Sequence, residues 1–159
     1  VLLRYGQSLE ARGMNEEAKA AYRRLIELRP TDVAALNNLA YLLVLEGGND
    51  AEAIELAERA RDILPTNPNV LHTLGLAQLE AGKIEDAEKN LRAAMQIKPG
   101  DPTLLLDNGR LLMQQGNNED GLNQILAAKT YAQQLGLRFD RLEEAETILA
   151  QNAAAANTN

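Results

Sequence analysis

The sequence predicts an all-α solenoid in which one helix-turn-helix unit is repeated four times and is followed by a C-terminal capping helix. Two observations predict this fold: small residues recur down the 159-residue chain at a constant spacing, and prolines follow at the same spacing. The residues spaced 34 or 35 positions apart are Gly6, Ala40, Gly75 and Gly109; Gly13, Gly47, Gly82 and Gly116; Ala18, Ala53, Ala87 and Gly121; and Pro30, Pro65 and Pro99. A period of about 20–50 residues is typical of one unit stacked on itself, and stacked repeats usually present a binding surface.

The third copy shows the unit most clearly. Asn67 followed by Pro68 predicts a helix start, because asparagine caps free amides and proline fits the first helical position. Apolar residues at helical spacing then continue to Gly82, where we expect a turn. A second apolar series ends before Pro99, since proline cannot continue a helix. Short connections of this kind place the two helices antiparallel to each other.

The small residues within the helices predict a close contact between the two helices of a unit. Gly75 in the first helix and Ala87 in the second have no bulky side chain. Glycine in a helix interior costs about 1 kcal/mol relative to alanine, so its recurrence at this place indicates that close packing offsets that cost.

The spacing gives boundaries for the elements. We expect repeats over residues 1–32, 33–67, 68–101 and 102–135, within one domain over residues 1–151. Asp140 with Glu143 resembles a capping box and predicts a capping helix over 140–151 that covers the last repeat. Residues 152–159 lack periodicity and are expected to form a flexible tail. Because the chain begins with Val1 inside the first helical pattern, we expect it to be a fragment of a longer protein.

The pattern resembles the tetratricopeptide repeat, a helix-turn-helix unit of about 34 residues with the consensus W-x2-L-G-x2-Y, A-x3-F and P. The third copy matches it with Leu71, Leu74, Gly75, Ala87, Leu91 and Pro99. The match covers residues 1 to about 130. Asn108 and Gly121 depart from the consensus, as terminal repeats often do. The resemblance implies a right-handed solenoid that acts as a bacterial, non-catalytic scaffold, either cytoplasmic or periplasmic.

The resemblance also implies a binding surface, because in this family the first helices line a concave groove. We include Asn38 among the groove residues because it matches an asparagine of the clamp by which some family members bind a terminal carboxylate. The remaining clamp positions hold Leu3, Gln7, Asn69 and Thr73, so a carboxylate clamp is not expected. The groove residues implied by register are Asn37, Asn38, Tyr41, Asn69, His72, Leu76, Arg110, Met113 and Gln114.

This mixture of amide, aromatic and aliphatic groups suits an extended peptide or a helix of a protein partner. Helical geometry supports the assignment, because Asn37 and Tyr41 are four residues apart and share a face. Two alternatives remain open. In the first, Leu76 packs on neighbouring helices and does not face a ligand. In the second, the chain is a self-associating structural or oligomerisation module of a larger envelope or assembly protein.

Composition excludes several other functions. The net charge of −7 argues against nucleic acid and anionic membranes as partners, and no apolar run is long enough to insert into a membrane. The chain has no cysteine and a single histidine, so neither a metal site nor a cofactor is expected. No nucleophile, base and orienting group fall together, so the chain is not expected to be an enzyme. The acidic runs are expected in the first turns of helices, where the helix dipole favours them.

Overall fold

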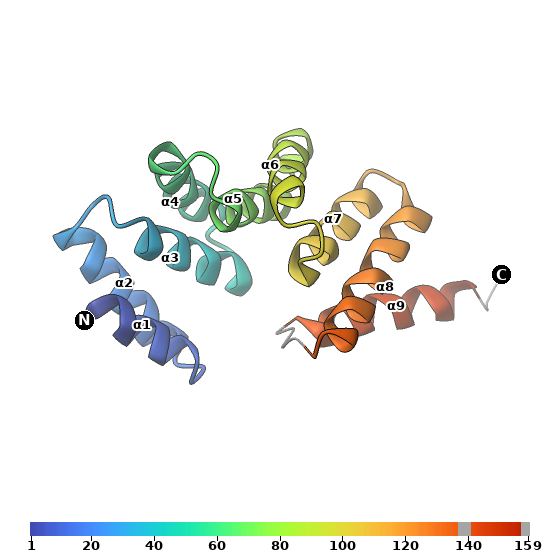
Figure 1. Cartoon of the computed structure of the whole chain (residues 1–159), viewed down its shortest axis with the longest axis horizontal. Coiled ribbons are helices and arrows are strands. Elements are labelled where there is room, and N and C mark those ends of the chain that lie inside the picture. The colour runs from blue at the N-terminus through green and yellow to red at the C-terminus, as the bar shows by residue number, and fades with distance from the viewer. Residues whose placement is uncertain (137–140, 157–159) are drawn as a thin grey trace. The chain divides into compact units, whose positions relative to one another are not determined.

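The computed structural model describes residues 1–136 and 141–156, and the regular structure in these ranges is α-helical. From α1 to α8, successive helices are joined by short turns, and α1 lies against α2, α3 against α4, and α7 against α8 (Figure 1). The helices of the described ranges are α1 (Leu2–Glu10), α2 (Asn15–Leu28), α3 (Val33–Glu46), α4 (Asp50–Ile63), α5 (Pro68–Glu80), α6 (Ile84–Ile97), α7 (Pro102–Gln114), α8 (Asn118–Gln134) and α9 (Leu142–Ala156). The predicted all-α class and its helix-turn-helix order are confirmed, and each predicted repeat contains two successive helices.

The chain forms two compact units, Val1–Asn90 and Leu91–Asn159, and the boundary between them along the sequence falls within α6. The first unit contains α1 to α5 and the start of α6, and the second contains the end of α6 and α7 to α9. A single domain over residues 1–151 therefore stays a prediction.

Glycines end the first helices because the chain must adopt a left-handed conformation there. Gly13, Gly47, Gly82 and Gly116 have φ angles of 73°, 73°, 70° and 85°, a region that glycine enters without steric cost. Side-chain caps are present at the starts of α3, α5 and α7, where Asp32, Asn67 and Asp101 accept hydrogen bonds from backbone amides. Asn67 Oδ1 accepts hydrogen bonds from the backbone amides of Asn69 at 3.0 Å and Val70 at 3.3 Å, which confirms the predicted start of α5.

The acidic runs lie where the sequence predicts them. The members of these runs in the first turns of second helices and of α9 are Glu16 and Glu17, Asp50 and Glu52, Glu85 and Asp86, and Glu143 and Glu144. Glu119 and Asp120, which belong to no such run, occupy the same place in α8. In these positions a carboxylate faces the positive end of the helix dipole, so the acids stabilise helices and need no catalytic explanation.

In the first unit, a small residue allows α1 to approach α2. A Cβ atom added at Gly6 would lie 2.5 Å from Cε1 of Tyr22, whose side chain is fully buried. Ala18 and Ala53, the small residues of the second helices, are also fully buried. The contact at Gly6 confirms the predicted close approach of paired helices in the first repeat.

In the second unit, the departure from the consensus at Gly121 has a packing reason. A Cβ atom at Gly121 would lie 2.7 Å from the backbone oxygen of Gly109 and 2.5 Å from Cγ of Met113. A Cβ atom at Gly109 would in turn lie 2.7 Å from the oxygen of Gly121. The backbones of α7 and α8 touch at this point, and glycine is required on both helices.

Helix α9 packs on the last repeat, as the capping prediction requires. Ala145 is fully buried in a cluster with Ile125 and Ala128 of α8, and Leu142 and Ile148 pack against that cluster. The helix continues to Ala156, so residues 152–156, which the sequence analysis assigned to the tail, are helical. Asp140 of the predicted capping box and residues 157–159 lie outside the described residues.

Candidate functional site

The first helices of the first unit bring uncharged polar side chains together around a hollow of about 370 Å³. Five amide side chains and four apolar ones line it, and none of the lining side chains is ionisable. The lining residues are Gln7 of α1; Val33, Ala34, Asn37 and Asn38 of α3; Leu64 after α4; and Asn67, Asn69 and Val70 at the start of α5. We call this set the amide hollow. It contains three of the predicted groove residues, Asn37, Asn38 and Asn69.

A buried tyrosine fixes the orientation of Asn38. Nδ2 of Asn38 donates to the hydroxyl of Tyr22 at 3.3 Å, and that hydroxyl donates to Oε2 of Glu10 at 2.8 Å. Burial raises the pKa of Tyr22 above its usual value, and its hydrogen bond to Glu10 raises the pKa further. The phenol therefore remains protonated at neutral pH, and the nitrogen of the Asn38 amide is directed toward it.

Asn37 carries an unmet hydrogen-bonding need. Its side chain is half-buried, and its Oδ1 is buried without a hydrogen-bond donor among the described residues. Leaving a buried acceptor unsatisfied costs about 1–3 kcal/mol. A donor in the amide hollow would recover this energy if the Asn37 side chain turned its Oδ1 from the interior toward the hollow.

Two further predicted groove residues lie close to each other. The rings of Tyr41 on α3 and His72 on α5 have centroids 6.3 Å apart and are tilted by 50°, and both residues are half-buried. Leu76, by contrast, is fully buried and belongs to the core of the first unit. Leu76 therefore packs on neighbouring helices, which is the alternative that the sequence left open.

The remaining predicted groove residues belong to α7 in the second unit. Met113 is half-buried and Gln114 is exposed. Arg110 is engaged in ion pairs: its Nη1 lies 3.3 Å from Oδ1 of Asp107, and its Nε lies 3.3 Å from Oε1 of Glu144 on α9. The Arg110 side chain therefore connects α7 to α9.

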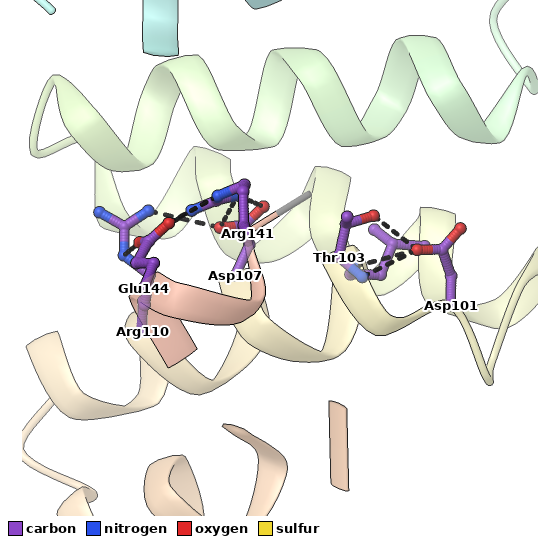
Figure 2. A network of polar contacts seen from close by, with 7 residues as sticks. Asp101, Thr103, Asp107, Arg110, Arg141 and Glu144 are labelled. Atoms are coloured by element: carbon purple, nitrogen blue, oxygen red, sulfur yellow. Dashed lines mark hydrogen bonds and ion pairs between the residues drawn. The ribbon is translucent and has the colours of Figure 1, made fainter. Parts of the chain in front are cut away.

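Arg110 is part of a buried network that the sequence analysis missed (Figure 2). Nη1 of Arg141 lies 2.7 and 2.8 Å from the two carboxylate oxygens of Asp107, which is fully buried. Nε and Nη2 of Arg141 contact the two carboxylate oxygens of Glu144 at 2.7 and 2.9 Å. Asp107 and Arg141 are 34 residues apart, which is one repeat period. This spacing was the sequence feature from which their pairing could have been predicted.

A second hollow of the first unit, of about 320 Å³, lies between α2 and α4. Unlike the amide hollow, it has charged residues in its lining, and Arg23 and Glu52 at its edge pair with each other at 2.5 Å. Its residues provide controls for experiments on the amide hollow.

Stacked helix-turn-helix units with a polar hollow between their first helices define a helical-repeat protein. Two family models, both described as tetratricopeptide repeat, match residues 3–68 and 78–135. Together these matches span most of the chain, so the chain belongs to the tetratricopeptide repeat family. Proteins of this family generally bind other proteins and act as non-catalytic interaction modules.

A TPR repeat-containing protein of Pseudomonas aeruginosa is similar in sequence, with 34% identity over 92 residues. The similar region covers 57% of this chain and 16% of that protein, so the chain spans only a small part of its relative's length. Within the described residues, no helix combines the length and apolar character needed to cross a membrane.

Solved structures with this fold include MamA from Desulfovibrio magneticus RS-1, with a TM-score of 0.68, 16% identity, and coverage of 84% of this chain and 75% of that one. The APC/C hetero-tetramer of Cut9 and Hcn1 contains a chain that matches with a TM-score of 0.84 and 16% identity, over 99% of this chain and 30% of that one. At these identities the likeness concerns the fold alone.

Proposed function

We propose that this chain is a non-catalytic binding module that scaffolds a complex by holding an extended segment of a partner protein against the first helices of its first unit. One observation carries this function above the others: three helices from different repeats bring amide side chains to one hollow of about 370 Å³. The proposed contact residues are Asn37, Asn38, Tyr41, Asn69 and His72.

The chemistry of the surface suits a peptide segment. A side-chain amide has both a donor and an acceptor, as a peptide group does, so asparagine can bind a main chain without selecting its charge. Tyr41 and His72 add ring surfaces, and aromatic rings contribute much of the energy of protein interfaces. No lysine or arginine lines the amide hollow, so a terminal carboxylate would find no cation there.

Two of the groove residues implied by register do not enter the proposed contact surface. Leu76 is fully buried, and Arg110 is paired with Asp107 and Glu144. On α7, Met113 and Gln114 are proposed as a separate contact, and we test them apart from the first unit.

Affinity capture from bacterial lysate tests the proposed function. The wild-type chain is compared with the double variant Asn37→Ala/Tyr41→Ala, and bound proteins are quantified by mass spectrometry. The matched control is Glu55→Ala, because Glu55 is exposed and lines the hollow between α2 and α4. We expect a partner that the wild type and the control retain and that the double variant loses, while circular dichroism shows all three to be equally helical.

Two results would count against this function. If the double variant retains every partner of the wild type, the amide hollow is not the binding surface. If Glu55→Ala loses the partner and the double variant keeps it, the partner binds across α2 and α4. A third variant, Met113→Ala/Gln114→Ala, tests the contact on α7 in the same experiment.

Self-association is the alternative function, and one observation favours it. Each second helix carries an exposed large apolar residue at the same position of its repeat, where a monomer gains nothing from an apolar side chain. These residues and their exposed fractions are Leu28 at 57%, Ile63 at 40%, Ile97 at 50% and Tyr131 at 46%.

Sedimentation over a range of protein concentrations separates the two functions. Self-association through these residues predicts a mass that rises with concentration and that falls to the monomer in Leu28→Glu/Ile63→Glu. The same series on a chain truncated after Gln134, which lacks α9, tests pairing through the C-terminal helix. A monomeric mass at all concentrations would remove the alternative.

A further inference from the structure

We infer that the amide hollow of the first unit is a side-chain subsite for an uncharged primary amide, that is, for a glutamine or asparagine side chain of the partner. This inference rests on the proposed function and names the group that the surface selects. Four features carry it: the amide acceptors, of which Oδ1 of Asn37 has no donor among the described residues; the absence of ionisable groups from the lining; the apolar part of the lining; and the volume of the hollow.

The amide hollow offers acceptors that need donors. Oδ1 of Asn37 is buried without a donor among the described residues. Asn38 turns its Nδ2 to the hydroxyl of Tyr22, which leaves the carbonyl half of that amide for the hollow. Asn67 is not available as an acceptor in the same way, because its Oδ1 already caps α5. Oδ1 of Asn37 is shielded from solvent, so binding requires the half-buried Asn37 amide to turn its oxygen toward the hollow. Two acceptors then match the two N–H donors of a primary amide, whereas a hydroxyl has one donor.

A charged side chain is selected against in this hollow. Its lining contains no carboxylate to compensate an ammonium group and no cation to compensate a carboxylate. Transferring an uncompensated charge out of water is much more costly than transferring a neutral amide. A lysine could satisfy the two acceptors but would lose its hydration without gaining an ion pair.

The remainder of the hollow suits the methylene stem of such a side chain. Val33, Ala34, Leu64 and Val70 form the apolar part of its lining. Leu64 is 44% exposed, so its side chain is available to a ligand. With a volume of about 370 Å³, the hollow has room for one side chain together with its main-chain amide.

Peptide titrations followed by NMR test the subsite with defined probes. The probes are blocked pentapeptides of alanine with a central glutamine, glutamate, lysine, methionine or alanine. Each is added to the full 159-residue chain while backbone amide signals are recorded. Methionine is the matched control for glutamine, because it has a similar length and flexibility but lacks the amide.

We expect the glutamine peptide to shift the signals of residues 33–38 and 67–70, with an affinity at least about fivefold higher than that of the methionine, glutamate and lysine peptides. In Asn37→Asp, which has nearly the same shape, the acceptor becomes anionic, and the lysine peptide should become the tightest of the five. Asn123→Asp, an exposed change on α8, should leave the order of affinities unchanged.

The outcomes distinguish this inference from the function on which it rests. If all peptides, including the one with central alanine, shift the same signals equally, the surface binds main chain and the side-chain subsite is wrong. If the glutamine peptide shifts no signals at the highest concentration it reaches, the subsite is also wrong, and the capture experiment decides the function separately. An unchanged order of affinities in Asn37→Asp would show that Asn37 does not make the proposed contact.

Discussion

Replacing Gly121 by alanine gives opposite expectations from the repeat pattern and from the structure. The three other copies hold alanine at this position, as Ala18, Ala53 and Ala87, so agreement with the repeats favours the change. Alanine also has the higher helix propensity, by about 0.8–1.0 kcal/mol. In the structure, however, a Cβ atom at Gly121 would lie 2.7 Å from the backbone oxygen of Gly109, and backbone cannot move aside as a side chain can.

The net effect follows from these two contributions. The added methyl group also lies 2.5 Å from Cγ of Met113, so α7 and α8 must separate by several tenths of an ångström. Overpacking typically costs about 1–3 kcal/mol, and the contact with backbone, which cannot move aside, places this change in the upper part of that range, at about 2–3 kcal/mol. After subtraction of the gain in propensity, we expect Gly121→Ala to lower the free energy of unfolding by about 1–2 kcal/mol.

Urea unfolding followed by circular dichroism measures this change. Gly100→Ala is the control, because a Cβ atom there meets no atom within 4 Å and its φ angle is not in the left-handed region. We expect the control to change stability by no more than about 0.5 kcal/mol. Hydrogen exchange should place the loss of protection of Gly121→Ala in α7 and α8. Stability equal to or above that of the wild type would show that the close contact of α7 and α8 is not present in solution.

Two other side chains give predictions that unfolding experiments can check. Tyr22→Phe should lower the free energy of unfolding by about 1–2 kcal/mol at pH 7, because Glu10 and Asn38 lose their shared partner. Burial raises the pKa of Tyr22 from a usual value of 10.0, so above about pH 10 the unfolded wild type releases a proton that the folded wild type retains. The free energy of unfolding of the wild type then falls relative to that of Tyr22→Phe, and the difference between the two should shrink by about 1.4 kcal/mol per pH unit. A difference that stays constant above about pH 10 would contradict the raised pKa of Tyr22. Arg141→Met should cost about 3 kcal/mol, because it leaves a fully buried carboxylate without its closest cation, whereas Arg61→Met, at an exposed pair, should cost less than about 0.5 kcal/mol.

Features that depend on local conformation could be predicted from the sequence. Gly82 marks a left-handed turn because few other residues adopt that backbone conformation without strain. Asn67 marks the start of α5 because its side chain caps amides two and three residues away. Both signals act over a few residues, and repetition in several copies made them unambiguous.

Features that depend on contacts between helices were harder to predict. Gly121 departs from the consensus, but only the positions of the Gly109 and Met113 atoms explain why. The partner of Asp107 is Arg141, the residue immediately before α9, and the position of that helix is set by packing. The length of α9 was underestimated because a run of alanines has no apolar periodicity and yet has a high helix propensity.

The candidate site could be predicted only in part, for the same reason. Register alone identifies the side of the first helices, and the structure brings Asn37, Asn38 and Asn69 to one hollow. Register cannot distinguish a surface residue from a buried or paired one, as Leu76 and Arg110 show. It also cannot identify Tyr22, which lies on a second helix and orients Asn38.

Site-specific photo-crosslinking tests the central claim of a partner held on the first helices most directly. A benzoylphenylalanine residue is introduced in place of Gln7, an exposed residue in the lining of the amide hollow, or in place of Glu55 in the hollow between α2 and α4. After irradiation in a bacterial lysate, crosslinked proteins are identified by mass spectrometry. We predict one partner that crosslinks at position 7 and not at position 55, and that is lost when Asn37→Ala is added. Crosslinking at position 55 alone, or an adduct at position 7 that Asn37→Ala does not reduce, would contradict the claim that the first helices hold the partner.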